Sequence, residues 1–158
     1  MIGRALATIA LLVAAGCQGT RVDEGPGAVA RFFLEARAES VARVTLPVSE
    51  VELSIEAKPV LTEYDFAAVE VGELELGKCL VFRMTPEAAR DLYRLTVANQ
   101  GRRLVLAIDG EAWGARPIEA PIEDGVLAVF VEVPETALPE LARKLAATTA
   151  RMRAEGKR

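Results

Sequence analysis

An uninterrupted apolar run at residues 104–108, followed by Asp109-Gly110, constrains the fold of this chain more than any other feature. A strand without a polar face is typical of a sheet that is covered on both sides. Asp-Gly after such a strand is a strong signal for a two-residue hairpin turn. We therefore expect an inner strand, a tight turn and a short return strand that carries Trp113, the sole tryptophan of the chain.

The residues before this strand predict an amphipathic helix. Thr85 can cap a helix whose first residue is Pro86, where a missing N–H is tolerated. The helix is expected to run to about Asn99, and Gly101 suits the left-handed residue that ends a helix. Apolar or small residues recur at helical spacing, at Ala88, Ala89, Leu92, Tyr93, Leu95 and Thr96. One face of this helix is therefore expected to be buried.

Three strands are expected ahead of this unit. The first spans residues 29–36 and pairs with residues 41–46 across a turn at Glu39-Ser40. Apolar and polar residues then alternate strictly from 51 to 57, which predicts a half-buried strand. Pro59 is expected to end that strand, because proline cannot donate to a sheet ladder.

The rest of the chain supplies further strands and the second helix. Residues 69–76 and 79–84 are expected to be extended, and residues 126–133 predict a second inner strand after a turn at Asp124-Gly125. A final helix is expected to begin near Leu138. The order of elements predicts an α+β fold, with a mostly antiparallel sheet and two helices packed on one face of it.

Two motifs imitate ligand sites. Glutamates alternate along the strand at 50, 52 and 56, but a straight acidic face does not converge on a cation, so no metal site is predicted. Gly72 to Lys78 matches the first seven positions of a phosphate-binding loop, but Cys79 replaces the magnesium-binding hydroxyl. The residues that follow are strand-like, whereas such a loop must open a helix. We therefore expect a hairpin near Gly77-Lys78, no nucleotide and no cofactor.

Composition argues against catalysis and against nucleic acid. The chain has no histidine, the commonest general base. Its serines, at 40, 49 and 54, do not lie in a nucleophile elbow. Carboxylate pairs such as Glu123-Asp124 occur at turns. The formal net charge is −4 without a basic cluster, so nucleic acid is not an expected partner. No catalytic residue is proposed, and an enzyme is the least favoured class.

The N-terminus has the pattern of a secretory signal. Arg4 precedes an uncharged apolar run from Ala5 to Ala15, which is too short for a membrane-spanning helix of about 20 residues. The tetrad Ala14-Ala15-Gly16-Cys17 resembles the lipobox of bacterial lipoproteins, although leucine is commoner at the first position. That resemblance implies cleavage before Cys17 and lipidation of its thiol and new amino group, which would anchor the protein to a membrane.

These features divide the chain into four parts. Residues 1–16 are the predicted signal peptide, 17–27 a lipidated flexible tether, 28–150 the folded domain and 151–158 a basic tail. By the rule known for enterobacterial lipoproteins, Gln18 favours the outer membrane in a cell that has two. Lipidation of Cys17 would leave Cys79 as the remaining thiol, so no intramolecular disulfide is expected, and its apolar neighbours predict a buried, unreactive side chain.

The folded part resembles the head of the first periplasmic domain of SecD, the proton-driven accessory subunit of the Sec translocase. The residues that carry the resemblance are 80–89 (LVFRMTPEAA), Leu95-Thr96, 99–104 (NQGRRL), Ile108-Asp109-Gly110, Pro117-Ile118, Pro121-Ile122 and Gly125, together with 62–66 (TEYDF). It covers roughly residues 60–147 and is loose for 28–59. The spacing from Trp113 to Pro117 is about one residue longer than the resemblance implies. The membrane helices of SecD and their proton-carrying carboxylates have no counterpart in this sequence.

The resemblance implies a non-catalytic envelope module that contacts exported or envelope polypeptides. Trp113, Asp109 and Gly110 form the candidate partner-binding edge. Trp113 can be an exposed ligand platform or a half-buried packing residue beside the hairpin. The alternative function is a structural envelope lipoprotein that associates only with itself.

Overall fold

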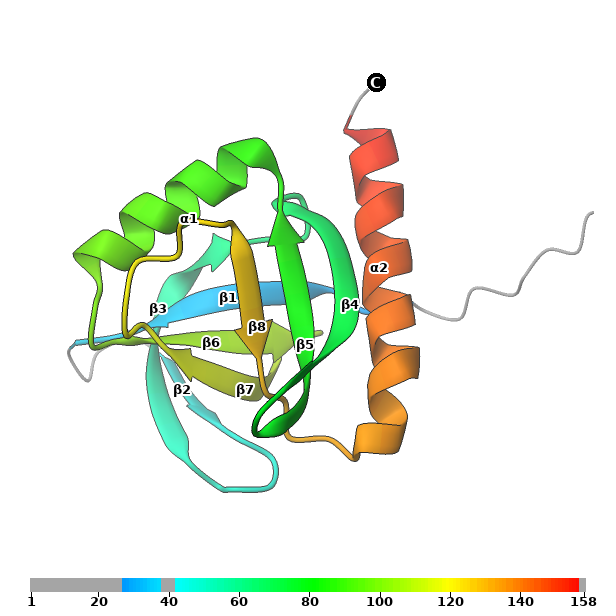
Figure 1. The fold of residues 1–158 in the computed structure, drawn as a ribbon. Helices are drawn as coiled ribbons and strands as arrows, with labels where there is room; N and C mark the ends of the chain where they lie inside the picture. Colours follow the sequence, from blue (N-terminus) through cyan, green and yellow to red (C-terminus); the bar gives the residue numbers. More distant parts are fainter. Residues whose placement is uncertain (1–26, 38–41, 157–158) are drawn as a thin grey trace, which may run out of the picture.

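The computed structural model describes residues 27–37 and 42–156, which fold into two antiparallel sheets and two helices (Figure 1). The strands are β1 (Ala30–Glu35), β2 (Ala42–Thr45), β3 (Glu52–Leu61), β4 (Phe66–Leu74), β5 (Gly77–Met84), β6 (Arg103–Ile108), β7 (Glu111–Pro117) and β8 (Val126–Val129). The helices are α1 (Pro86–Ala98) and α2 (Leu138–Glu155), the latter preceded by the 3-10 turn Glu135–Ala137. Within these residues, neither helix has the length and apolarity that a membrane span requires.

All described strand pairs are antiparallel, which confirms the predicted α+β class. The strands lie in two sheets, not in the single sheet expected from the sequence. The larger has the order β2-β3-β1-β6-β7, and the smaller has the order β4-β5-β8. The predicted inner strand is β6, between β1 and β7.

The main core lies between the two sheets and is closed by the helices. Phe32 of β1 contacts Phe66 and Phe82 of the smaller sheet, with ring centroids 6.0 and 5.0 Å apart. All three side chains are fully buried. Leu92 of α1 and Leu145 of α2 reach the same core, so both helices contribute to it.

A second, smaller core lies on the opposite face of the larger sheet. Leu53 and Ile55 of β3 pack there with Val105 of β6 and Ala112 of β7. The two edge strands of this sheet, β2 and β7, also contact each other. The sheet is therefore curled, and β6 is covered on both faces as its all-apolar sequence predicts.

Helix α1 forms where the sequence predicts it. The Thr85 hydroxyl accepts a hydrogen bond from the Ala88 N–H at 3.3 Å, and Pro86 is the first helical residue. Asn99 is the C-cap, and Gly101 has a φ of 80°. Helix α2 packs along β4 and continues to Glu155, beyond residue 150, where the predicted tail begins.

Two expectations about the first strands are wrong. β2 pairs with β3, not with β1, because β1 is enclosed by β3 and β6 on its two edges. Pro59 lies inside β3 opposite Phe33 and does not end the strand. The described pairing of β3 with β2 stops at Ile55, so at Pro59 the strand pairs with β1 alone. The register of the β1–β3 pair also shifts next to Pro59, and a missing N–H is tolerated at such a position.

The segment that imitates a phosphate-binding loop is a β-hairpin. Gly72 pairs with Cys79 across β4 and β5, and residues 75 and 76 form the turn just before the predicted Gly77-Lys78. The Cys79 side chain is fully buried, and burial raises the pKa of its thiol, as expected for an unreactive cysteine.

Candidate functional site

The Asp109-Gly110 turn joins β6 to β7 and is also tied to the start of β1. Asp109 has a φ of 51° and Gly110 a φ of 90°, as a tight hairpin turn with two left-handed residues requires. The Val29 N–H donates to the Asp109 carboxylate at 2.9 Å, and the Asp109 N–H donates to the Val29 carbonyl at 2.9 Å. Asp109 therefore holds the turn in place, and Gly110 remains at the surface.

Two surface hollows share Gly110 of this turn, and a third lies at the tip of the β2–β3 hairpin; we call the three together the turn groove. The first, of about 480 Å³, is lined by Val29, Arg31, Phe33, Ala107, Asp109 and Gly110. The second, of about 360 Å³, shares Gly110 and continues along Val44, Thr45, Pro47, Glu111 and Ala112. The third, of about 380 Å³, is lined by Val48, Ser49, Glu132, Val133 and Pro134. The predicted residues Asp109 and Gly110 thus lie at one end of a longer surface.

A partly buried ion pair holds Arg31, which lines the first hollow. The Arg31 guanidinium donates to both carboxylate oxygens of Glu63, at 2.9 and 3.0 Å. Glu63 is only 6% exposed, and Arg31 is about half exposed. The hydrogen bond from Arg31 outweighs burial and lowers the pKa of Glu63. Arg31 is thereby positioned and its charge is compensated.

The third hollow is organised by Glu132. Its carboxylate accepts hydrogen bonds from the Val48 and Ser49 N–H groups, at 2.7 and 2.9 Å, and so holds the tip of the β2–β3 hairpin. Burial raises the pKa of Glu132, but the hydrogen bonds from Ser49 and Val48 outweigh it, and the net shift is downward. Val48 itself is 73% exposed.

The β4–β5 hairpin reaches the same end of the molecule. Lys78 lies 3.7 Å from the Glu135 carboxylate, just beyond the third hollow. Leu76, at the tip of that hairpin, is 86% exposed. Two hairpin tips with apolar side chains therefore flank the segment that leads into α2 (Figure 1).

Trp113 does not line the turn groove. Its side chain is half-buried and packs against the main core, and its Nε1–H has no acceptor among the described residues. Its carbonyl accepts a hydrogen bond from the Glu132 N–H at 2.8 Å. The structure therefore places Trp113 where β7 meets the chain after β8, as the half-buried alternative expects.

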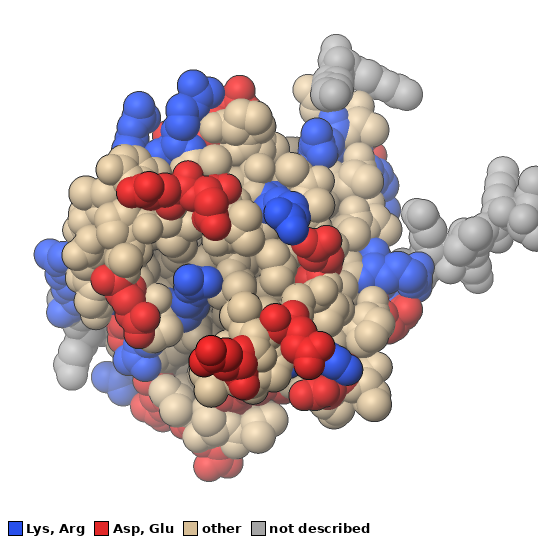
Figure 2. All heavy atoms as spheres, viewed as in Figure 1, with Lys and Arg blue, Asp and Glu red and all other residues tan. Residues whose placement is uncertain are grey.

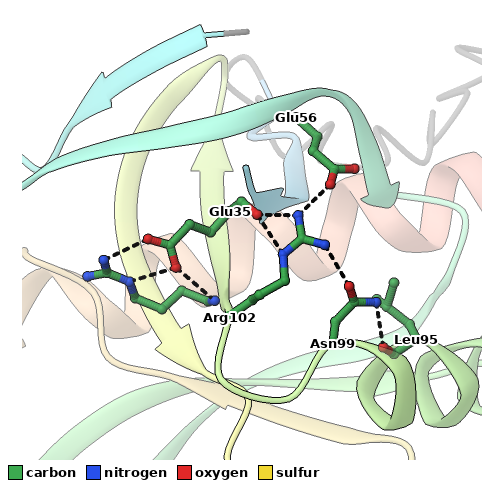
Figure 3. A network of polar contacts seen from close by, with 6 residues as sticks. Glu35, Glu56, Leu95, Asn99 and Arg102 are labelled. Atoms are coloured by element: carbon green, nitrogen blue, oxygen red, sulfur yellow. Dashed lines mark hydrogen bonds and ion pairs between the residues drawn. The ribbon is translucent and has the colours of Figure 1, made fainter. Parts of the chain in front are cut away.

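A polar network fixes the strands on which the groove is built (Figure 3). Arg102, between α1 and β6, donates to the Glu35 carbonyl and to the carboxylate of Glu56. Its remaining nitrogen donates to the Asn99 side chain at 2.6 Å, which in turn donates to the Leu95 carbonyl. Arg102 thus joins β1, β3 and the end of α1.

The neighbouring Arg103 binds the side chain of Glu35, the last residue of β1. It donates to both carboxylate oxygens of Glu35, at 2.7 and 3.0 Å, and this hydrogen bonding outweighs burial and lowers the pKa of Glu35. The predicted solvated glutamate row is accordingly divided, because Glu56 is bound to Arg102 while Glu52 stays exposed. No group of potential metal ligands occurs in the described part of the chain.

A larger hollow, of about 580 Å³, lies against α1 and contains none of the predicted residues. It is lined by Ala89, Arg90, Tyr93, Arg94 and Glu123. Its two arginines are more than two-thirds exposed and lie near acidic residues of their own helix. Exposed pairs of this kind are common on helix surfaces, so we give this hollow less weight than the turn groove.

Sequence reasoning missed Val48 and Glu132. The available signal for Val48 was an apolar residue in the Pro47–Glu50 turn, where polar residues are usual. Glu132 had no signal, because its partners lie more than eighty positions away. Cys17, the predicted lipidation site, lies outside the described residues.

The walls of the turn groove combine apolar side chains with carboxylates that hold backbone groups. The groove therefore has the features of a recognition surface.

No family model matches the chain, and no curated protein matches its sequence. Its fold is that of a SecD-head-like α+β module. A structure described as SecDF in a super-membrane-facing form is 21% identical, with a TM-score of 0.60 over 76% of this chain and 19% of that chain.

Two further solved structures agree. One, described as a membrane component SecDF that enhances protein export, has a TM-score of 0.58 and 20% identity over 78% of this chain and 62% of that chain. The other, SecDF from Thermus thermophilus, described as a translocon-associated membrane protein, has a TM-score of 0.54 and 20% identity over 80% of this chain and 20% of that chain. This chain thus spans from 19% to 62% of the length of these three chains, and the likeness shows the fold alone.

Proposed function

We propose that this protein is a non-catalytic, lipid-anchored module of the cell envelope that binds exported or envelope polypeptides through the turn groove. The observation that carries the proposal is the SecD-head-like fold, because the matched SecDF is described as enhancing protein export. The turn groove supplies a surface of suitable character on that fold.

The anchor in this proposal is Cys17, after removal of residues 1–16. Cys17→Ser is expected to abolish labelling by a fatty-acid probe and to leave unprocessed precursor. Normal processing and labelling of that variant would refute the anchor. Gln18 leads us to propose the outer membrane in a cell with two membranes, and separation of the membranes on a density gradient checks this.

Binding is tested by in-cell photo-crosslinking of the full chain. A photoreactive residue at position 111, in the second hollow, is expected to give adducts with envelope or exported polypeptides. The same residue at position 87, which is 77% exposed on α1, is the matched control. Adducts that are no stronger at 111 than at 87 would contradict the proposal.

Self-association is the second candidate, and the exposure of Leu76 and Val48 favours it. In that case the main adduct at position 111 has the mass of two copies. The apparent mass by light scattering would then rise with concentration. A monomer at all concentrations, with adducts to other polypeptides, favours the first candidate.

A further inference from the structure

Apolar side chains and carboxylates together line the turn groove. The apolar side chains that line it are Val29, Phe33, Val44, Ala107, Ala112, Val48 and Val133. The acidic ones are Asp109, Glu111 and Glu132, so each hollow carries one carboxylate. Glu111 is exposed at the start of β7.

Two positive charges at the groove, Arg31 and Lys78, are already compensated. Arg31, the one basic residue among the described lining, is bound by both carboxylate oxygens of Glu63. Lys78, at the far end, lies beside Glu135. The carboxylates of the groove therefore impose a net negative potential on any ligand that enters it.

On the face shown in Figure 2, acidic side chains predominate in the lower half, and basic side chains gather at the upper edge, over α1 and the C-terminal part of α2. An anionic lipid surface would be repelled by the groove, and two copies meeting groove to groove would repel each other. Charge complementarity thus selects a cationic ligand.

We infer that the turn groove binds an extended apolar polypeptide segment flanked by lysine or arginine. The apolar lining contacts the central side chains, and the carboxylate of Glu111 lies beside the basic flank. This inference rests on the proposed function and specifies the chemistry of the polypeptide partner.

The test measures binding of fluorescent peptides to the purified full chain by anisotropy. The peptides are about twelve residues long, which spans about 40 Å when extended, and share one Leu/Ala core. Their flanks are Lys-Lys, Ser-Ser or Glu-Glu. We expect the Lys-flanked peptide to bind at least fivefold more tightly than the Glu-flanked one at 50 mM salt, with a ratio that shrinks at 500 mM.

Two variants with matched controls assign the effect to the groove. Glu111→Lys is expected to reduce the preference for Lys flanks at least threefold, whereas Glu87→Lys on α1 makes the same charge change and leaves it unaltered. Val48→Ser is expected to weaken all peptides at least threefold, whereas Val97→Ser, at an exposed apolar position of α1, has no effect. Thermal unfolding confirms that each variant is folded.

The outcomes separate this inference from the proposed function. Equal affinity for Lys and Glu flanks, or equal effects of Glu111→Lys and Glu87→Lys, would overturn the charge preference even where crosslinking at position 111 succeeds. Binding of anionic vesicles in place of the peptides would overturn it as well. Absence of both peptide binding and crosslinking would overturn the proposed function itself.

Discussion

Glu63 couples the stability of this protein to pH. The hydrogen bond from Arg31 lowers the folded-state pKa of Glu63, so the pair stabilises the fold above the unfolded-state pKa of about 4.3. That stabilisation is lost as the pH falls through the folded-state pKa. Because Arg31 is half exposed, we expect a loss of about 1 to 2 kcal/mol. Urea unfolding between pH 7 and pH 3 measures it.

Substitution of Glu63 checks whether the Arg31–Glu63 pair is a source of the acid sensitivity. Glu63→Gln is expected to lower the free energy of unfolding at pH 7 and to flatten its dependence on pH below 5. Glu87→Gln, at an exposed position, is the control and should retain the wild-type profile. An unchanged acid slope in Glu63→Gln would exclude this pair as a source of acid sensitivity. Glu35, whose pKa Arg103 lowers, contributes a slope of the same sign.

The Arg102 side chain contacts Glu35, Glu56 and Asn99 and is 12% exposed. Arg102→Ala removes the donor to the Glu35 carbonyl, the Asn99 side chain and the Glu56 carboxylate, so we expect a cost of about 2 to 3 kcal/mol. Arg102→Lys keeps the charge but not the planar fork and should recover less than half. Arg90→Ala, on the exposed face of α1, is the control for chemical denaturation. Equal costs for Arg102→Ala and Arg90→Ala would contradict the prediction.

At the scale of elements, the parts with local signals were predictable. Helix α1 carries its own start at Thr85-Pro86, and the β6–β7 turn carries Asp109-Gly110. The partner of β2 was not predictable. A strand at residues 42–45 can pair with β1 or with β3, and it pairs with β3 because β6 and β3 occupy the two edges of β1. The second sheet was hidden for the same reason, since strand order is set by contacts distant in sequence.

The candidate site shows the same division. Asp109 and Gly110 were found from one dipeptide, and they do mark one end of the turn groove. The other end forms where Glu132 binds the backbone of Val48 and Ser49, which are brought together only by the folded sheets. The partner-binding role of these residues and of Trp113 stays a prediction.

Gly114 and Gly110 lie on the same hairpin but have different requirements. A Cβ at Gly114 would lie 2.2 Å from the Phe130 carbonyl oxygen, whereas at Gly110 nothing lies within 4 Å. Gly114→Ala must therefore displace β7 from the chain after β8, and we expect a loss of at least about 2 kcal/mol. Gly110→Ala makes no close contact but places alanine at a positive φ, so the free energy of unfolding should fall by about 1 kcal/mol. Thermal unfolding compares the two, and a larger loss for Gly110→Ala would contradict the close approach.

At the scale of the whole molecule, three phenylalanines make the two sheets interdependent. Phe32 belongs to the larger sheet and packs edge to face on Phe82 of the smaller one, and Phe66 lies 4.9 Å from Phe82 between ring centroids. No described strand pair joins the sheets. Side-chain packing in the main core therefore carries much of their association, and the chain should unfold as one unit.

Phe82→Ala tests this interdependence. The lost burial and the cavity are expected to cost about 3 to 5 kcal/mol, a large share of a typical stability of about 5 to 15 kcal/mol. Trp113 reports on the larger sheet by fluorescence, and far-ultraviolet circular dichroism reports on both sheets. Because the sheets share one core, the urea midpoints of both signals should fall by the same amount. Tyr93→Ala, at a 42% exposed position, is the control and should lower both midpoints by less. A Trp113 transition that stays in place while the circular dichroism transition shifts or splits would show that the larger sheet is stable without the smaller one.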